Sequence, residues 1–157
     1  AEDGIRDVER SRGLGDVYKR QVHKKFKMTK KEMTERILKA INNKFVNVIG
    51  HISGRLINTR EPYDIDYEKI FKRAAETSTA IEINAQPERL DLIDIYVKQA
   101  IKYGVKLLIG TDAHNIHTLN YMIYGVGVAR RGWAQSKDIL NTYSIEEIKK
   151  WINKKRK

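Results

Sequence analysis

The sequence contains no cysteine and no long apolar run. Without a thiol among its 157 residues, disulfide bridges and cysteine-based zinc sites are excluded, so any metal ion must be held by His, Asp or Glu. No apolar run approaches the roughly 18–20 residues that a membrane-spanning helix requires, and no signal-peptide pattern opens the chain. We therefore expect a cytoplasmic protein with no membrane partner.

The charge of the chain is strongly unbalanced. It carries 31 Lys and Arg against 20 Asp and Glu, a formal net charge of +11. This excess favours an anionic partner, such as nucleic acid or a phosphate-bearing substrate, over a cationic one. The alternative is a lysine-rich solvated surface with no specific partner.

The first 21 residues differ from the rest of the chain. Residues 1–21 are polar and rich in Gly and Arg, and they show no sustained helical or strand period. They resemble a peptide obtained when sequencing-adaptor DNA is translated at the end of an environmental assembly. We expect 1–21 to be a non-native or disordered leader and 22–157 to be a partial domain.

From residue 22 the pattern alternates between strand and helix. Apolar runs predict strands at 45–49, 79–83 and 105–109, with an uncertain first strand near residue 22. Between these strands, capping residues and apolar periods predict three helices, at 29–42, from 64 or 66 to 75, and at 91–101. A fourth helix is predicted after the last strand, with one face formed by Ile116, Leu119, Ile123 and Val126. The last predicted helix has four residues facing inward: Ile145, Ile148, Trp151 and Ile152. This order predicts an α/β fold with parallel strands, whose ligands bind at the carboxyl ends of the strands.

Polar residues gather at those predicted strand ends. Asp112 and His114 follow the 105–109 strand, two residues apart. His51 follows the 45–49 strand, and His23 follows the uncertain first strand. A lone histidine is usually structural, but three of the four on one rim, together with an aspartate, favour a site for Mn²⁺, Zn²⁺ or Fe²⁺. His117 lies one turn into a helix, where a supporting or surface role is expected.

Several ordered stretches carry a family resemblance. They are GHISGR at 50–55, EINA at 82–85, PERLDL at 87–92, TDAH at 111–114, YGVG at 124–127 and ARRGW at 129–133. Together they resemble the PHP (polymerase and histidinol phosphatase) domain, most of all that at the C-terminal end of bacterial and archaeal family X DNA polymerases. The resemblance covers about 22–152 and implies the C-terminal portion, about four β/α units, of a distorted (β/α)7 PHP barrel.

The resemblance also implies a ligand set. It assigns His23, His51, Asp112 and His114 as ligands of a cluster of Mn²⁺ or Zn²⁺ ions, although Gln21 stands where Ser is usual. A metal-bridging hydroxide held by Asp112 and His51 would attack phosphorus. The family's opening H-x-H, its next His or Asp, and its mid-barrel His and Glu have no counterpart before His23. We therefore expect a fragment with an incomplete cluster.

Four further residues are candidates for contacting the substrate phosphate: Arg55, Asn84, Arg130 and Arg131. A guanidinium can hold two phosphate oxygens at once, which favours Arg55, next to His51. The alternative is a surface Arg55 that pairs with Glu61 or Asp64. For Arg130 and Arg131 the alternative is a helix-end or structural role.

Three functions fit these patterns. The first is a metal-dependent nuclease domain, acting in 3'–5' exonuclease or end processing during DNA repair, with a polymerase core (a DNA nucleotidyltransferase) N-terminal to it in a parent chain. The second is a free-standing PHP phosphatase that acts on a small monoester, as histidinol phosphatases do. The third is a non-catalytic basic fragment that binds polyanions. The 124–133 stretch and the positive charge favour the first, and we expect the isolated chain to be inactive.

Overall fold

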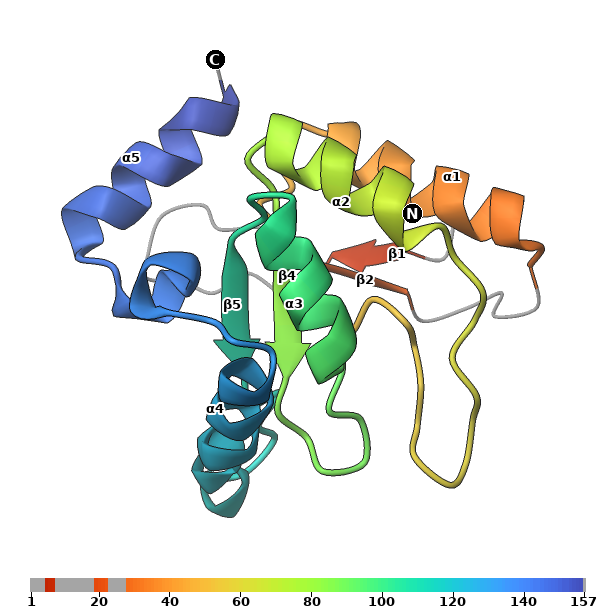
Figure 1. Cartoon of the computed structure of the whole chain (residues 1–157), viewed down its shortest axis with the longest axis vertical. Helices are drawn as coiled ribbons and strands as arrows, with labels where there is room; N and C mark the ends of the chain where they lie inside the picture. Colours follow the sequence, from red (N-terminus) through yellow and green to blue (C-terminus); the bar gives the residue numbers. More distant parts are fainter. Residues whose placement is uncertain (1–4, 8–18, 23–27, 157) are drawn as a thin grey trace.

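The chain folds as an α/β protein around one sheet. A computed structural model describes residues 5–7, 19–22 and 28–156, with only the backbone of the first two segments. Five strands lie in the order β1-β2-β3-β4-β5 (Figure 1). They are β1 (Ile5–Asp7), β2 (Lys19–Val22), β3 (Val48–Ile49), β4 (Ala80–Asn84) and β5 (Leu107–Gly110). Strands β2 to β5 are parallel to their neighbours, and β1 pairs antiparallel with β2.

The α/β class predicted from the sequence is thus confirmed, while barrel closure stays a prediction. Strands β1 and β2 lie mostly within the range expected to be a leader. Whether that range is native, and where the domain begins, also stay predictions.

The helices follow the strands in alternation. They are α1 (Lys30–Asn42), α2 (Tyr67–Glu76), α3 (Asp94–Lys102), η1 (Ile116–Tyr121), α4 (Met122–Arg131), η2 (Ser136–Asp138), η3 (Leu140–Thr142) and α5 (Ile145–Arg156). Helix α1 begins with the predicted capping box, in which Thr29 and Glu32 satisfy each other's backbone N–H groups. Its buried face includes Met33, Ile37 and Ile41, as its apolar period predicts.

The two faces of the sheet have different roles. Ile81, Ile83 and Ile109 join the main core with α1, α2 and α3. Ala80 packs on the opposite face with Val48 and Leu140, where side chains of α5 also pack. Because side chains alternate along a strand, Glu82 and Asn84 share the face of Ala80. The polar residues of β4 therefore lie on the side of the sheet away from α1–α3.

Two helical segments differ from the sequence expectation. The face that carries Ile116, Leu119, Ile123 and Val126 is exposed, and η1 forms its first part. Helix α4 instead buries Gly125 and Ala129. In α5 Ile145 is exposed while Ile152 is buried, so the predicted inward position of Ile145 is wrong.

The helices of the described part of the chain were compared with what a membrane span requires. None of its helices combines the length and the apolar character that a membrane span requires.

Candidate functional site

Polar groups meet at the edge of the sheet where β3, β4 and β5 end. The parallel register brings the ends of β4 and β5 level, with Asn84 opposite Gly110. His51 follows β3, and Asp112 follows β5. In Figure 1 the arrowheads of β4 and β5 point toward this edge, beside α4. The structure therefore brings three chain segments together, as expected for parallel strands.

Glu82 connects the end of β4 to the loop after β3. Its side chain is fully buried, at 0% exposure, and its Oε2 accepts a hydrogen bond from the backbone N–H of His51 at 2.8 Å. His51 is 3% exposed and has a positive φ of 28°, which a histidine rarely adopts. A Cβ at Gly110 would contact Glu82 Oε1, so the glycine leaves room for this carboxylate.

Asn84 connects β4 to Asp112. Its Nδ2 donates to Asp112 Oδ2 at 3.1 Å and to Glu82 Oε2 at 3.4 Å. Gln86 Nε2 donates to the carbonyl oxygen of Asp112 at 2.9 Å. Together these bonds hold Asp112, whose φ is 51°, in a left-handed conformation that aspartate tolerates better than most residues.

The ring of His114 is oriented by the same carbonyl. Its Nδ1 lies 2.7 Å from the backbone oxygen of Asp112, and a carbonyl can only accept, so Nδ1 carries the proton. A neutral His114 then has its lone pair on Nε2, the nitrogen that could bind a metal ion.

The predicted ligands are thus only partly placed. His51, Asp112 and His114 lie at one edge of the sheet, and His23 lies outside the described residues. Within the described ranges, no three His, Asp or Glu side chains are grouped so that they could hold a metal ion. The role of these residues as metal ligands stays a prediction.

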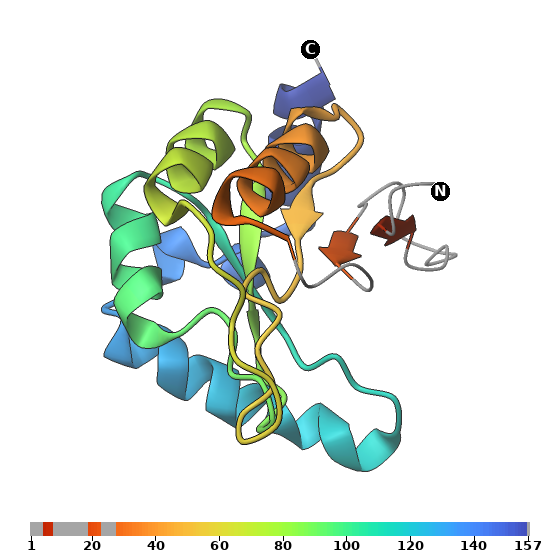
Figure 2. The ribbon, with the colours of Figure 1, turned by 90° about the vertical axis from the view of Figure 1, so that its right-hand side faces the viewer.

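The arginines predicted to bind phosphate have structural contacts. Arg55 donates from Nε to the carbonyl of Arg89 at 2.5 Å and from Nη2 to that of Leu90 at 2.8 Å. It therefore ties together the loops after β3 and β4, which run side by side in Figure 2. Arg131 on α4 forms an ion pair with Asp94 on α3 at 2.8 Å. Arg130 is exposed in the last turn of α4.

Asp91 is a polar residue that sequence reasoning did not single out. It is 1% exposed, and its Oδ2 accepts from the backbone N–H groups of Ser53 at 2.9 Å and Gly54 at 3.1 Å. Its backbone pairs with Asn84 in an antiparallel bridge. Burial raises the pKa of Asp91 to about 6, while hydrogen bonds from Ser53 oppose the rise. Only its place in the RLDL stretch pointed to it, because burial of a loop aspartate has no local sequence signature.

Comparison with known proteins indicates which classes of enzyme the chain is similar to. No family model matches the chain. It is 38% identical over 139 residues to a Bacillus subtilis protein named DNA polymerase/3'-5' exonuclease PolX, covering 88% of this chain and 24% of that protein. It is 29% identical over 133 residues to a probable phosphatase of Thermoanaerobacter, covering 79% of this chain and 50% of the relative. A probable phosphatase of Caldicellulosiruptor saccharolyticus is 37% identical over 87 residues, covering 52% of this chain and 34% of that protein.

These relatives are longer than the matched region. The chain spans about a quarter of the polymerase/exonuclease and up to half of these phosphatases. The comparisons agree in one respect: a chain with this strand-end cluster is similar to part of proteins named as an exonuclease or as phosphatases.

Proposed function

We propose that this chain forms part of a PHP-type, metal-dependent phosphoesterase domain that hydrolyses DNA phosphodiesters in a protein of the family X DNA polymerase type. The observation that carries the proposal is the strand-end cluster, in which Glu82 and Asn84 connect His51 to Asp112. The 38% identity to a polymerase/3'-5' exonuclease supports DNA as the substrate. The polymerase core and the activity of a whole protein are parts of this proposal.

The donor atoms suit Mn²⁺ or Zn²⁺. Imidazole nitrogen and carboxylate oxygen are ligands that both ions accept. His51, Asp112 and His114 would contribute ligands, with His23 from outside the described residues. The bound ions would stabilise negative charge on the phosphoryl oxygens and lower the pKa of a bound water. Because the described residues alone do not complete a metal site, we propose that this chain is inactive by itself.

The role of the surrounding residues is to orient the donors. Asn84 donates to one oxygen of Asp112 and thereby fixes the plane of that carboxylate. Glu82 accepts from the backbone of His51 and thereby fixes the loop that carries the imidazole. Such supporting bonds typically contribute about 10–100-fold to metal affinity or activity.

Phosphate contacts are the least defined part of the proposal. Arg55 uses Nε and Nη2 to hold carbonyl oxygens, and among the described residues its Nη1 makes no hydrogen bond. That nitrogen is the part of Arg55 we assign to phosphate. The Arg131–Asp94 ion pair supports the structural alternative for Arg131, which leaves Arg130 as the exposed candidate on α4. The net charge of +11 favours a polyanionic substrate.

A second candidate is a phosphatase acting on a small monoester. The similarity to probable phosphatases favours this candidate specifically, and in one of them the matched region is half of the protein. Hydrolysis of p-nitrophenyl phosphate without cleavage of an oligonucleotide would select this candidate over the nuclease.

Metal binding by the chain tests the ligand assignment. We expect weak Mn²⁺ binding by residues 1–157, measured by electron paramagnetic resonance, and a further loss of about tenfold or more in Asp112→Ala and in His51→Ala. His117→Ala is the matched control, because His117 is an exposed histidine on η1 near the same edge. Equal affinities in Asp112→Ala and His117→Ala would contradict the assignment.

Cleavage of a 3'-labelled single-stranded oligonucleotide with added Mn²⁺ tests the activity. We expect little or no turnover from residues 1–157. Robust cleavage that Asp112→Ala abolishes would show that the ligand set is complete and would overturn the inactivity proposal. In a longer protein that joins this domain to a polymerase core, we expect cleavage that Asp112→Ala removes.

A further inference from the structure

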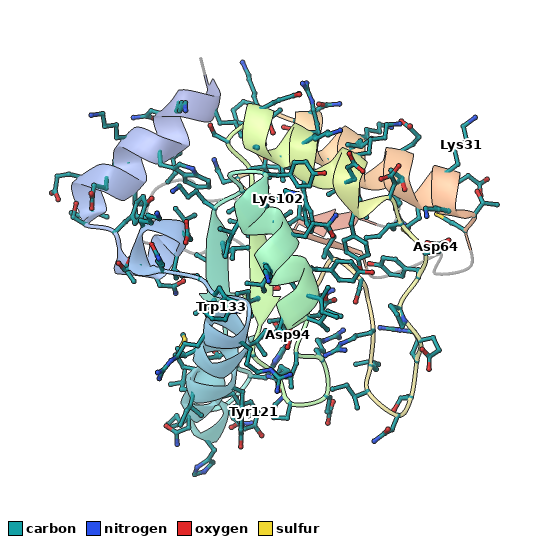
Figure 3. All side chains as sticks on the ribbon, viewed as in Figure 1. Lys31, Asp64, Asp94, Lys102, Tyr121 and Trp133 are labelled. Carbon is teal, nitrogen blue, oxygen red and sulfur yellow. The ribbon has the colours of Figure 1, made fainter. Side chains whose placement is uncertain are left out.

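A cavity lies beside the strand-end cluster, and apart from Arg55 its lining residues have no role in the proposed phosphoester chemistry. Its volume is about 250 Å³, and it opens between the loop after β3 and the starts of α2 and α3. Asp64, labelled in Figure 3 in the segment that precedes α2, is one of its lining residues. Drug-sized ligands fill pockets of about 300–1,000 Å³, so this cavity suits a single small ring system.

The wall of the cavity contains a buried acceptor that lacks a donor. Asp91 lines the cavity at 1% exposure. Its Oδ2 is bonded to the backbone of Ser53 and Gly54, whereas Oδ1 has no hydrogen-bond partner among the described residues. A buried carboxylate oxygen without a protein donor costs free energy, so the site favours a ligand that donates a hydrogen bond to Oδ1.

The positive charge of Arg55 affects which ligand charge the cavity favours. Arg55 lines the same cavity, and although burial raises the pKa of Asp91, the positive charge of Arg55 partly opposes that rise. The guanidinium offsets the carboxylate, so a cation would gain little there. A neutral group that donates to Asp91 and accepts from one of the two N–H groups of Arg55 Nη1 satisfies both side chains, and the other N–H stays available to phosphate. Such a group is an N–H next to a carbonyl on one edge of the ligand.

Tyrosine side chains form part of the cavity lining. Tyr67 and Tyr96 both line it, and they stack on each other with ring centroids 3.6 Å apart and planes 15° apart. Tyr63 completes this aromatic surface. Aromatic faces favour contact with a planar ring over a branched aliphatic group.

We propose that this cavity binds a nucleobase through an edge that presents an N–H beside a carbonyl, as thymine and hypoxanthine do. The backbone bridge between Asp91 and Asn84 places the cavity next to the strand-end cluster. A base in the cavity would therefore belong to a nucleotide whose phosphodiester lies at that cluster. The choice of a nucleobase among planar amides rests on the proposed function.

Nuclear magnetic resonance titration of ¹⁵N-labelled residues 1–157 with thymidine, without metal, tests the proposal. We expect saturable shifts of the backbone amides of Ser53, Gly54 and Ile93. N3-methylthymidine, which lacks the N–H, should bind at least about tenfold more weakly, because Oδ1 would stay without a donor. A thymidine decamer that binds more tightly than thymidine would identify the strand, rather than the free nucleoside, as the source of the base.

Matched variants locate the binding. Ile93→Trp fills the cavity and should abolish the shifts, as should Tyr96→Leu if the tryptophan variant does not fold. Ile95→Trp is the control, because Ile95 is 69% exposed on the same helix and does not line the cavity. Absence of shifts at 10 mM thymidine, equal binding of N3-methylthymidine, or the same shifts with the cation agmatine would overturn the proposal. Thymidine binding by residues 1–157, together with no oligonucleotide cleavage by a longer protein that joins this domain to a polymerase core, would contradict the proposed function alone.

Discussion

Glu82 is buried completely, and its carboxylate connects β4 to the loop after β3 rather than facing solvent. The residue next to it in space, Gly110, has no side chain to displace it. The sequence placed Glu82 on the same face of β4 as Asn84, which the burial of both side chains fits. It did not indicate that the partner would be the backbone of His51, because that contact joins residues 31 positions apart.

Asp91 is the residue whose ionisation should affect stability most clearly. Burial raises the pKa of Asp91 to about 6 from 3.8, so the folded state binds a proton more readily than the unfolded state. Stability from this group is fully present below about pH 4 and is lost as the pH rises through about 6. Above pH 6 the buried charge costs up to about 3 kcal/mol.

The variant Asp91→Asn tests this pH dependence. We expect its free energy of unfolding, relative to that of the unaltered chain, to increase between pH 4.5 and 7, as measured by urea unfolding. Asp94→Asn is the control. The Arg131 side chain lowers the pKa of Asp94, so its ionisation affects stability only below about pH 4. A relative stability of Asp91→Asn that is flat across this range would show that Asp91 is not buried as described.

Helix α4 is the element whose packing departs most from its sequence pattern. Its apolar period marks the face with Ile123 and Val126, yet the face with Gly125 and Ala129 packs on the sheet. A Cβ at Gly125 would contact Ile109 Cγ2 and lie 2.9 Å from Ala85 Cβ. The glycine that weakens helix propensity therefore permits close approach of α4 to β4 and β5. Propensity and packing oppose each other here, and packing decides.

Two glycine substitutions in α4 separate these effects. We expect Gly125→Ala to destabilise the protein by about 1–3 kcal/mol, because the added methyl group overpacks the contact with β5. We expect Gly127→Ala to be neutral or to stabilise by up to about 1 kcal/mol, because nothing lies within 4 Å of its Cβ and alanine favours the helix. Thermal unfolding measured by circular dichroism compares them. A Gly125→Ala variant as stable as Gly127→Ala would contradict the close approach.

The edge of β5 is covered by a side chain. Asn141 accepts from the backbone N–H of Ile109 at 2.8 Å and donates to its carbonyl at 3.0 Å, as a neighbouring strand would. Leu107 also forms a parallel bridge with Ile139. Unpaired strand edges promote aggregation, so this amide protects one edge of the sheet. No periodic pattern in the sequence marks such a contact.

The whole molecule combines a small sheet with a surplus of positive charge. The net charge of +11 should give it affinity for single-stranded DNA even where no cleavage occurs. If about four side chains neutralise phosphates, the logarithm of the binding constant should fall with the logarithm of salt concentration with a slope of about −3. Fluorescence anisotropy with a labelled oligonucleotide from 50 to 300 mM KCl measures it. A slope near zero would show that charge does not drive the binding.

Several features were readable from the sequence, because periodicity and capping are local properties of the chain. They are the order of strands and α-helices from α1 onward, the α1 capping box, and the strand ends that carry His51, Asn84 and Asp112. Tertiary structure alone decided the rest. The contacts of Glu82 with His51 and of Arg55 with the loop after β4 depend on how distant segments meet. The same holds for the buried Asp91 and for the cavity beside it. Local sequence sets the shape of each element. The partners of buried polar groups depend on packing between elements, and no short sequence pattern marks that packing.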